Sequence, residues 1–174
     1  MTNVKADVNT AIDDMTDGGL THVNFGAAWG WRMLSPMWRA AWGIDIDGYE
    51  LPLDYNTPSM NKAAVIMTDG ENTMRENRYT AYGELDDGEL NGATSENDAV
   101  DELNERLLMV CSNMKNAGIT VYTVAFGNPG VNIETMMEQC ASQPDFYFDP
   151  SSGADLSLAF QVIGDSLANL RVSK

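Results

Sequence analysis

The sequence predicts an α/β domain whose short, mostly parallel sheet is flanked by helices. Residues 63–68 and 119–126 are uncharged runs of apolar and β-branched side chains, which is typical of strands in the middle of a parallel sheet. Around them, apolar residues recur at steps of three and four, which indicates amphipathic helices. Strands that alternate with helices along a chain form parallel sheets with helices on their faces.

The chain opens with two expected helices and a long connection. Apolar spacing predicts a short helix over residues 4–15 and a second over 25–34, which ends near Pro36. Residues 35–61 show no clean period, so we expect an irregular connection, of a kind that is often functional or mobile. Two tryptophans in it, Trp38 and Trp42, either pack over the edge of the core or form a surface for a partner.

After the strand at 63–68, the chain alternates between helices and strands. Residues 71–96 are polar and acidic, and we expect a second irregular connection there. Ser95-x-x-Asp98 resembles a capping box that opens a strong helix, and Gly118 closes that helix. The elements expected next are the strand at 119–126, a short helix ending at Cys140, a short strand at 146–148 and a last amphipathic helix over 156–170. Three strands are few for such a sheet, so residues 1–174 are expected to form a single partial domain.

Length and charge narrow the classes of function. A chain of 174 residues fits one domain with a real core. Its formal net charge of −16 repels nucleic acid and anionic lipid surfaces, so neither is an expected partner. No stretch of about 18 apolar residues occurs, so we expect no membrane contact by this chain. Residues 1–10 lack the basic start and apolar stretch of a signal peptide.

One carboxylate and one hydroxyl are candidate metal ligands. Asp69 follows the strand at 63–68, and ligands of open α/β sheets bind in the crevice at the carboxyl ends of strands. A carboxylate there suits a hard divalent cation. Thr21, in the loop before the second helix, either offers its hydroxyl to such a cation or caps the helix. The acidic stretch 84–102 is either a calcium loop or, since it lacks the EF-hand spacing, a solvated loop.

The usual catalytic motifs are missing from the sequence. The only histidine is His22, so a Ser-His-Asp or Cys-His site would have to use it. There is no G-x-S-x-G, no G-x-x-x-x-G-K-[ST] and no G-x-G-x-x-G after a strand. Metal-dependent hydrolysis through Asp69 would need further acidic ligands at other strand ends, and the sequence offers none. We therefore expect a protein that is not an enzyme.

Three segments resemble a known family. KAAVIMTDGENT, residues 62–73, is similar to the fourth strand of von Willebrand factor A (vWA) domains, which ends in a motif of the metal-ion-dependent adhesion site (MIDAS). GGLTHVNFGAAWGWRML, residues 18–34, is similar to another MIDAS motif. LLMVCSNMKNAGITVYTVAFG and EQCASQPDFYFDPSSGADLSLAFQVIGDSL resemble the TadG-like proteins of tight-adherence (Tad) pilus loci. The resemblance covers nearly the whole chain and is weak over 35–61 and 71–96.

The resemblance implies a vWA-like, Rossmann-type fold with only part of its sheet. Of the vWA strand order 3-2-1-4-5-6, the chain would supply about strands 4, 5 and 6. Thr21 matches the MIDAS threonine and Asp69 the MIDAS aspartate, but the first motif, Asp-x-Ser-x-Ser, has no counterpart. Two ligands of about five or six make an incomplete site for Mg²⁺. We therefore expect that no cofactor is required and that Mg²⁺ binds only in a complete domain.

The chain contains two cysteines, Cys111 and Cys140. Taken alone, they are compatible with one disulfide or with two buried thiols. In the resembled family a pair of cysteines recurs in these segments, on a periplasmic domain where disulfides persist, so the resemblance implies a Cys111–Cys140 bridge. It also implies a periplasmic or cell-envelope location, with the full-length protein anchored in the inner membrane by an upstream helix.

The implied function is a non-catalytic interaction or adhesion module in Tad pilus assembly. Its partner would be a protein of the pilus or secretion machinery, bound through the crevice near Thr21 and Asp69 or through Trp38 and Trp42. A purely structural envelope domain is the alternative, and a metal-dependent hydrolase is a more distant one. The strand at 63–68 would lie at an open sheet edge, which predicts coverage by chain outside this sequence or a homodimer through that edge.

Overall fold

The computed structural model describes residues 4–16, 18–46 and 48–172. The helices are α1 (Lys5–Asp13), α2 (Val23–Leu34), α3 (Arg39–Trp42), α4 (Glu96–Asn116), α5 (Val131–Cys140) and α6 (Gly153–Val172), with 3₁₀ turns η1 (Pro36–Trp38), η2 (Leu85–Asp87) and η3 (Pro144–Phe146). The strands are β1 (Ile44–Ile46), β2 (Tyr49–Leu51), β3 (Ala63–Thr68), β4 (Thr120–Ala125) and β5 (Tyr147–Phe148). Within the described ranges, no helix is long and apolar enough to cross a bilayer.

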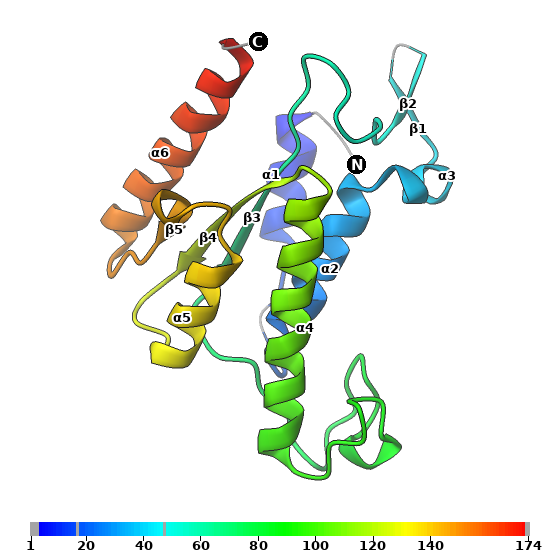
Figure 1. Cartoon of the computed structure of the whole chain (residues 1–174), viewed down its shortest axis with the longest axis vertical. Helices are drawn as coiled ribbons and strands as arrows, with labels where there is room; N and C mark the ends of the chain where they lie inside the picture. Colours follow the sequence, from blue (N-terminus) through cyan, green and yellow to red (C-terminus); the bar gives the residue numbers. More distant parts are fainter. Residues whose placement is uncertain (1–3, 17, 47, 173–174) are drawn as a thin grey trace.

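The main sheet consists of three parallel strands in the order β3-β4-β5. β3 pairs with β4 from Ala63 opposite Thr120 to Thr68 opposite Ala125, and the shorter β5 pairs with the other side of β4. The prediction of a short parallel sheet flanked by helices is confirmed (Figure 1). Because β4 is the one described strand that pairs with β3, β3 is an edge strand of this sheet, as the sequence predicted.

Helices α2, α4 and α5 cover one face of this sheet. Ile66 of β3 and Val121 of β4 pack there with Leu107 of α4, Ile133 of α5 and Ala27 of α2, all of them buried. Fully burying one of the larger side chains stabilises the fold by about 1.5–3 kcal/mol. This face therefore holds the main core of the molecule.

A disulfide joins two of these helices. Cys111 of α4 and Cys140 of α5 are bonded, with their Cα atoms 5.2 Å apart. Lys115 ties the same helices together, because its Nζ donates to the carbonyls of Gln139 and Ala141 at 2.8 and 3.3 Å, where α5 ends. The implied bridge is confirmed, and the alternative of two free thiols is wrong.

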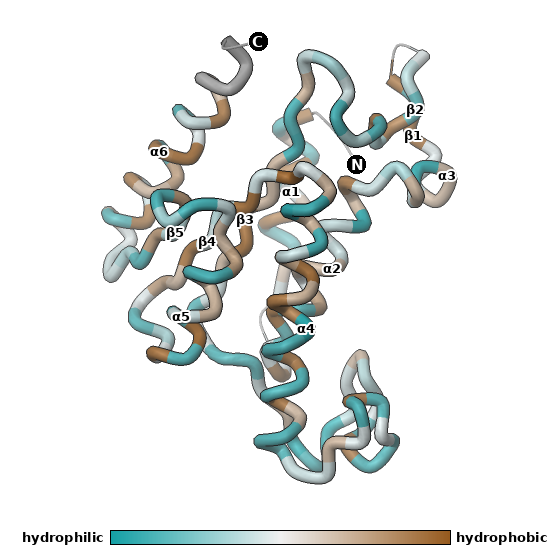
Figure 2. The backbone as a smooth tube through the Cα atoms, in the orientation of Figure 1, coloured by the Kyte–Doolittle hydropathy of each residue, from teal (hydrophilic) through white to brown (hydrophobic). Residues whose placement is uncertain are grey.

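Helix α6 covers the opposite face of the sheet, but only in part. Ile163 of α6 packs against Tyr122 and Val124 of β4, which are fully buried. On the same face of β3, Val65 and Met67 are 41% and 42% exposed. Figure 2 shows β3 as an apolar segment in the middle of the chain trace. The sheet is therefore covered over β4 and open over β3.

The first helix, α1, forms where the sequence predicts it but buries none of its residues. Val4, Val8, Ile12 and Met15 keep the apolar spacing that predicted the helix, yet all four are exposed. The spacing thus indicated the correct secondary structure, while the apolar side of the helix meets no core.

Residues 35–61, expected to be irregular, contain two short helical segments and an antiparallel hairpin. Ser35 Oγ accepts the Met37 N–H at 3.3 Å where η1 begins, and Gly43, with φ of +57°, ends α3. β1 and β2 pair with Asp45 opposite Glu50. Elements of three or four residues are too short to produce a readable apolar period, which is why the sequence showed none.

Residues 71–96, also expected to be irregular, form a long loop with a small core of its own. The loop side chains buried against α4 are Met74, Leu85 and Leu90. The carboxylate of Glu96 pairs with Arg75 at 2.6 Å, and Asp98 accepts from the Ser95 hydroxyl at the start of α4. Glu96 therefore ties the loop to α4, and Asp98 holds the Ser95 hydroxyl, whose oxygen caps the helix by accepting the Asp98 N–H.

Candidate functional site

The loop after β3 and the loop before α2 form one hydrogen-bonded unit. Thr73 Oγ1 accepts the Thr21 N–H at 2.8 Å, and the Thr73 N–H donates to the Thr21 carbonyl at 2.9 Å. The two residues are 52 positions apart in the sequence. A tertiary contact therefore holds Thr21 beside the segment that carries Asp69.

Asn72 is the buried centre of this unit. Its Oδ1 accepts the Val23 N–H at 2.7 Å, at the first turn of α2, and its Nδ2 donates to Asn104 Oδ1 of α4 at 2.8 Å. The N-cap residue of α2 is His22, whose side chain makes no capping hydrogen bond. The alternative role of Thr21 as the helix cap is therefore wrong, because α2 receives its cap from a side chain that follows β3.

His22 lies half-buried in the same unit. Its Nε2–H donates to the Thr73 carbonyl at 3.1 Å, and its ring lies 5.6 Å from that of Tyr82. Burial lowers the pKa of the imidazole below its ordinary value, and the hydrogen bond to Thr73 offsets this only in part. A neutral imidazole with Nε2 engaged in this way positions the loop before α2.

The predicted metal ligands lie near this unit but do not complete a cation site. Thr21 and Asp69 are both exposed. Mg²⁺ prefers a near-octahedral shell of oxygen ligands, so the two residues supply two donors of about six. In the part of the chain that the structure describes, no group of three or more His, Cys, Asp or Glu could hold a metal ion. The residues present do not fit a bound cation.

A second candidate site consists of aromatic side chains on α2, η1 and α3. We call Phe25, Trp29, Trp38 and Trp42 the aromatic surface. Trp38 and Trp42 stack with ring centroids 5.9 Å apart and planes 26° from parallel, and Trp29 lies 6.0 Å from Trp38. Phe25 extends the cluster at 6.3 Å from Trp29. Trp29 and Trp38 remain 40% and 36% exposed, which is much for a residue type that is highly buried on average.

Arg32 holds the aromatic surface together. Its guanidinium carbon lies 4.8 Å from the ring centroid of Trp29 and 5.2 Å from that of Trp38, both within cation–π range. Trp42 Nε1 donates to the Arg32 carbonyl at 3.2 Å. Ala27, on the other side of α2, is buried in the main core. The part of the aromatic surface that lies on α2 therefore faces away from the core in which this helix is anchored.

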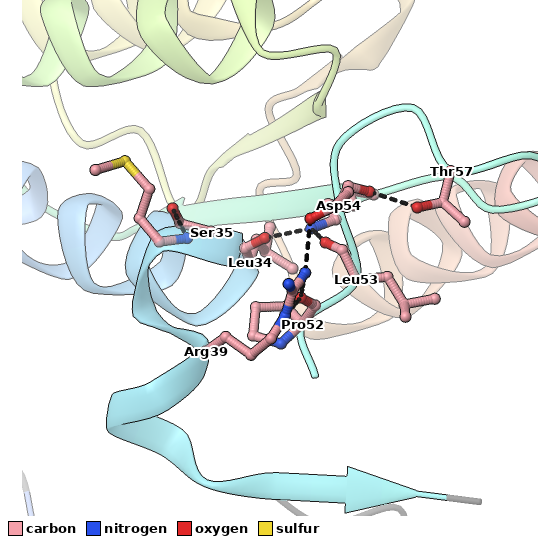
Figure 3. A network of polar contacts seen from close by, with 9 residues as sticks. Leu34, Ser35, Arg39, Pro52, Leu53, Asp54 and Thr57 are labelled. Carbon is pink, nitrogen blue, oxygen red and sulfur yellow. Dashed lines mark hydrogen bonds and ion pairs between the residues drawn. The ribbon is translucent and has the colours of Figure 1, made fainter. Parts of the chain in front are cut away.

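A polar network fixes this region to the sheet (Figure 3). The buried Lys62, just before β3, donates from Nζ to the carbonyls of Leu34 and Leu53. Arg39 pairs with Asp54 at 2.8 Å. Burial lowers the pKa of the Lys62 ammonium, the nearby Arg39 lowers it further, and Asp54 raises it in part. The end of α2, the start of α3 and residues 52–54 are thereby tied to the start of β3.

Two of the four residues of the aromatic surface can be predicted from the sequence. Trp38 and Trp42 were candidates for a partner surface, and they stack on each other at the surface. The spacing of Phe25 and Trp29 places them on the apolar side of the second helix and indicates no partner role. Their spacing of four residues was the available signal, since such a pair lies on one helix face. Which way that face points depends on packing and could not be told from the spacing.

The sheet, its flanking helices and a structural match define a vWA-like α/β module. The chain matches the structure of proximal thread matrix protein 1 (PTMP1) from the mussel byssus at 19% identity, with a TM-score of 0.51. The match covers 94% of this chain and 30% of that one, so the chain spans less than a third of that protein's length. At this identity the likeness concerns the fold.

Two further PTMP1 structures match over 98% of this chain and 29% of theirs. The one in crystal form 2 is 15% identical with a TM-score of 0.49, and the one with a zinc-occupied MIDAS motif is 16% identical with a TM-score of 0.48. No protein-family model and no curated protein matches the chain. The match at a TM-score of 0.51 supports the vWA-like fold, while the Tad pilus family stays a prediction.

Proposed function

We propose that this chain is a non-catalytic protein-interaction module that binds its partner through the aromatic surface. The observation that carries the proposal is the exposed cluster formed by Trp29 on the anchored helix α2, Trp38 on η1 and their neighbours. Tryptophan is enriched among the residues that dominate binding energy at protein interfaces. The network around Lys62 holds the backbone of this region, so little ordering would be needed on binding.

The proposed mode of contact does not use a metal. In vWA domains a complete MIDAS lets a metal ion bridge to a carboxylate of the partner, whereas Thr21 and Asp69 supply only two donors here. The module therefore requires no cofactor. A divalent cation such as Mg²⁺ would bind only where further donors complete the site.

The state of the candidate catalytic groups supports a non-catalytic role. His22 donates its Nε2–H to a backbone carbonyl, and Cys111 and Cys140 are bonded to each other. A nucleophile needs a base within hydrogen-bond reach, and these groups are engaged elsewhere. The competing function is a metal-dependent hydrolase centred on Asp69. Turnover of generic ester or phosphate substrates that is lost in Asp69→Ala would overturn the proposal.

We further propose that the module acts in Tad-type pilus assembly at the bacterial envelope. The sequence resemblance over residues 18–34, 62–73 and the C-terminal third supports this setting. The Cys111–Cys140 disulfide supports an oxidising compartment such as the periplasm. The partner would then be a protein of the pilus or secretion machinery, with the full-length protein anchored in the inner membrane by an upstream helix.

A pull-down from envelope extracts tests the proposal. The disulfide-bonded chain should capture one specific pilus or secretion protein, identified by mass spectrometry. The double variant Trp38→Ala/Trp42→Ala should lose this partner, since truncating a residue that dominates an interface costs about 2 kcal/mol or more. Asp69→Ala and Met109→Ala, the latter at an exposed position on α4, should retain it.

The other outcomes are equally informative. Loss of the partner in Asp69→Ala, with retention in the tryptophan double variant, would move the contact to the edge near Thr21 and contradict the proposed surface. Absence of specific capture by the wild-type chain would favour a purely structural envelope domain. Circular dichroism of each variant would separate loss of contact from loss of fold.

A further inference from the structure

We infer that the open edge of β3 pairs with β3 of a second copy of this chain, in an antiparallel, two-fold symmetric dimer. The joint sheet would then run continuously through both copies. The inference rests on the backbone and side chains of β3 and does not depend on the proposed function.

The unpaired backbone groups of β3 belong to alternate residues. The carbonyls of Lys62 and Thr68 accept hydrogen bonds from the chain at β4. Because backbone groups alternate in direction along a strand, the even-numbered residues of β3 turn toward β4. The N–H and C=O groups of Ala63, Val65 and Met67 therefore point to the free edge, where no described strand pairs with them.

The same residues carry exposed apolar side chains. Val65 and Met67 are each about two-fifths exposed, although their neighbours on β4 are fully buried. Edge strands that remain single are usually protected by charges, prolines or bulges. The strand Ala63–Thr68 has no charge and no proline, and it pairs with β4 without interruption. It thus lacks the usual protection against pairing.

In one antiparallel register, pairing of β3 with β3 of a second copy gives every backbone group on this edge a hydrogen-bond partner. When Val65 lies opposite the second copy's Val65, Met67 of each copy falls opposite Ala63 of the other. All three outward residues then exchange both of their hydrogen bonds. A shift by two residues would place one of the three opposite a residue outside the strand. In the central register, Val65 and Met67 also gather on one face of the joint sheet.

Charge favours this edge as the place where two copies meet. Each chain carries a formal net charge of −16, so most of its surface repels a second copy. The uncharged β3 edge avoids that repulsion locally. Two strands of this length bury less than the roughly 800 Å² per partner of a standard stable interface. We therefore expect a weak dimer that strengthens with salt, because salt screens the remaining repulsion.

Cysteine cross-linking tests the register directly. Both native cysteines are in the disulfide, so Val65→Cys introduces the one free thiol. A hydrogen-bonded antiparallel pair places its Cα atoms about 5.5 Å apart, within reach of a disulfide. Under mild oxidation, Val65→Cys should form a covalent dimer several-fold faster than Met109→Cys, the matched control with an exposed thiol on α4.

Light scattering across a concentration series tests the dimer itself. The wild-type chain should pass from monomer to dimer between low micromolar and submillimolar concentration, more completely at high salt. Val65→Pro removes an outward N–H that β4 does not use, so it should leave the fold intact and abolish the dimer. If that variant fails to fold, Val65→Lys provides the same test through charge.

Three results would each overturn the inference. One is a wild-type chain that stays monomeric across the whole series. Another is a dimer that survives the folded Val65 variant, since its interface would lie elsewhere. The third is cross-linking of Val65→Cys that is no faster than that of Met109→Cys.

Discussion

β3 and β4 are neighbours of equal length in one sheet, yet they differ in how completely they are covered. On the face that α6 covers, Tyr122 and Val124 of β4 are fully buried, whereas Val65 and Met67 of β3 are not. The difference does not come from composition, since both strands are apolar. It comes from what packs against each strand, because α6 covers this face over β4 but not over β3, and β4 has a strand on each side whereas β3 has one among the described strands.

The helices α4 and α1 differ in the same way. Both carry apolar residues at helical spacing, but α4 buries Leu103 and Leu107 completely and α1 buries none of its residues. A periodic apolar pattern thus indicates what an element is able to bury. Whether it does so depends on what packs against it. In this molecule the half around β4, α4 and α5 holds the buried core, whereas β3 and α1 leave apolar side chains exposed.

The largest expected effect is the loss of stability on removing the disulfide, which lies between α4 and α5 in the buried half of the molecule. Replacing Cys111 and Cys140 together by Ala should lower the free energy of unfolding by roughly 3–4 kcal/mol, because the bridge closes a long loop in the unfolded chain. Urea denaturation measures this loss. Reductant should have a similar effect on the wild-type chain and none on the double variant. A loss below about 1 kcal/mol would show that the bridge contributes little.

A pair of valines tests the comparison of the two strands. Val124→Ala should cost about 2 kcal/mol, from two buried methyl groups and the cavity they leave. Val65→Ala, on the same sheet face, should cost clearly less, since its side chain is already partly in water. Denaturation of the two variants in parallel measures the difference. Equal losses would mean that β3 is covered in solution.

The hydrogen-bonded unit around Asn72 gives the next effect. Asn72→Ala should cost about 1–2 kcal/mol, because the Val23 N–H and the Asn104 side chain lose their buried partner. Asn72→Asp keeps an acceptor for Val23 but loses the donor to Asn104 Oδ1 and buries a carboxylate, so it should cost at least as much at neutral pH. Thr21→Ala should be nearly neutral, since Thr73 bonds to the backbone of Thr21. Thermal or urea denaturation would rank the three variants, and a larger loss for Thr21→Ala would contradict this arrangement.

The smallest effect is a pH dependence from His22. Its pKa is lowered in the folded protein, so the unfolded chain binds the proton more readily. Stability should therefore fall as pH decreases through the ordinary value of 6.5, until the folded pKa is passed. His22→Gln retains an N–H donor for the Thr73 carbonyl and should show a flatter profile. Subtracting the stability curve of His22→Gln from that of the wild-type chain removes the pH dependence that the carboxylates contribute to both. Parallel curves would exclude this role for His22.

The sequence predicted the long elements of the fold for a physical reason. β3, β4, α4 and α6 each repeat one pattern over six or more residues, and the parallel order of the strands follows from their alternation with helices. The hairpin of β1 and β2 was missed because three-residue strands show no period. The core under the acidic loop was missed because Met74, Leu85 and Leu90 are isolated in polar sequence and gather only on folding.

In the candidate site, too, some residues could be predicted from the sequence and others come together only on folding. Trp38 and Trp42 stood out as large aromatic side chains in an irregular segment, and they lie together. Phe25 and Trp29 join them through the packing of α2, which spacing alone cannot orient. Asn72 accepts the Val23 N–H of α2 from a position 49 residues away in the sequence, so no local sequence pattern predicts that it caps this helix.

That β3 is an open edge is tested most directly by amide hydrogen exchange resolved residue by residue along the strand. In a dilute sample, the amides of Ala64 and Ile66, which face β4, should be protected, while those of Val65 and Met67 should exchange rapidly. Uniform protection of all four amides in the dilute monomer would mean that the chain covers this edge itself, and it would contradict the division between a closed and an open half.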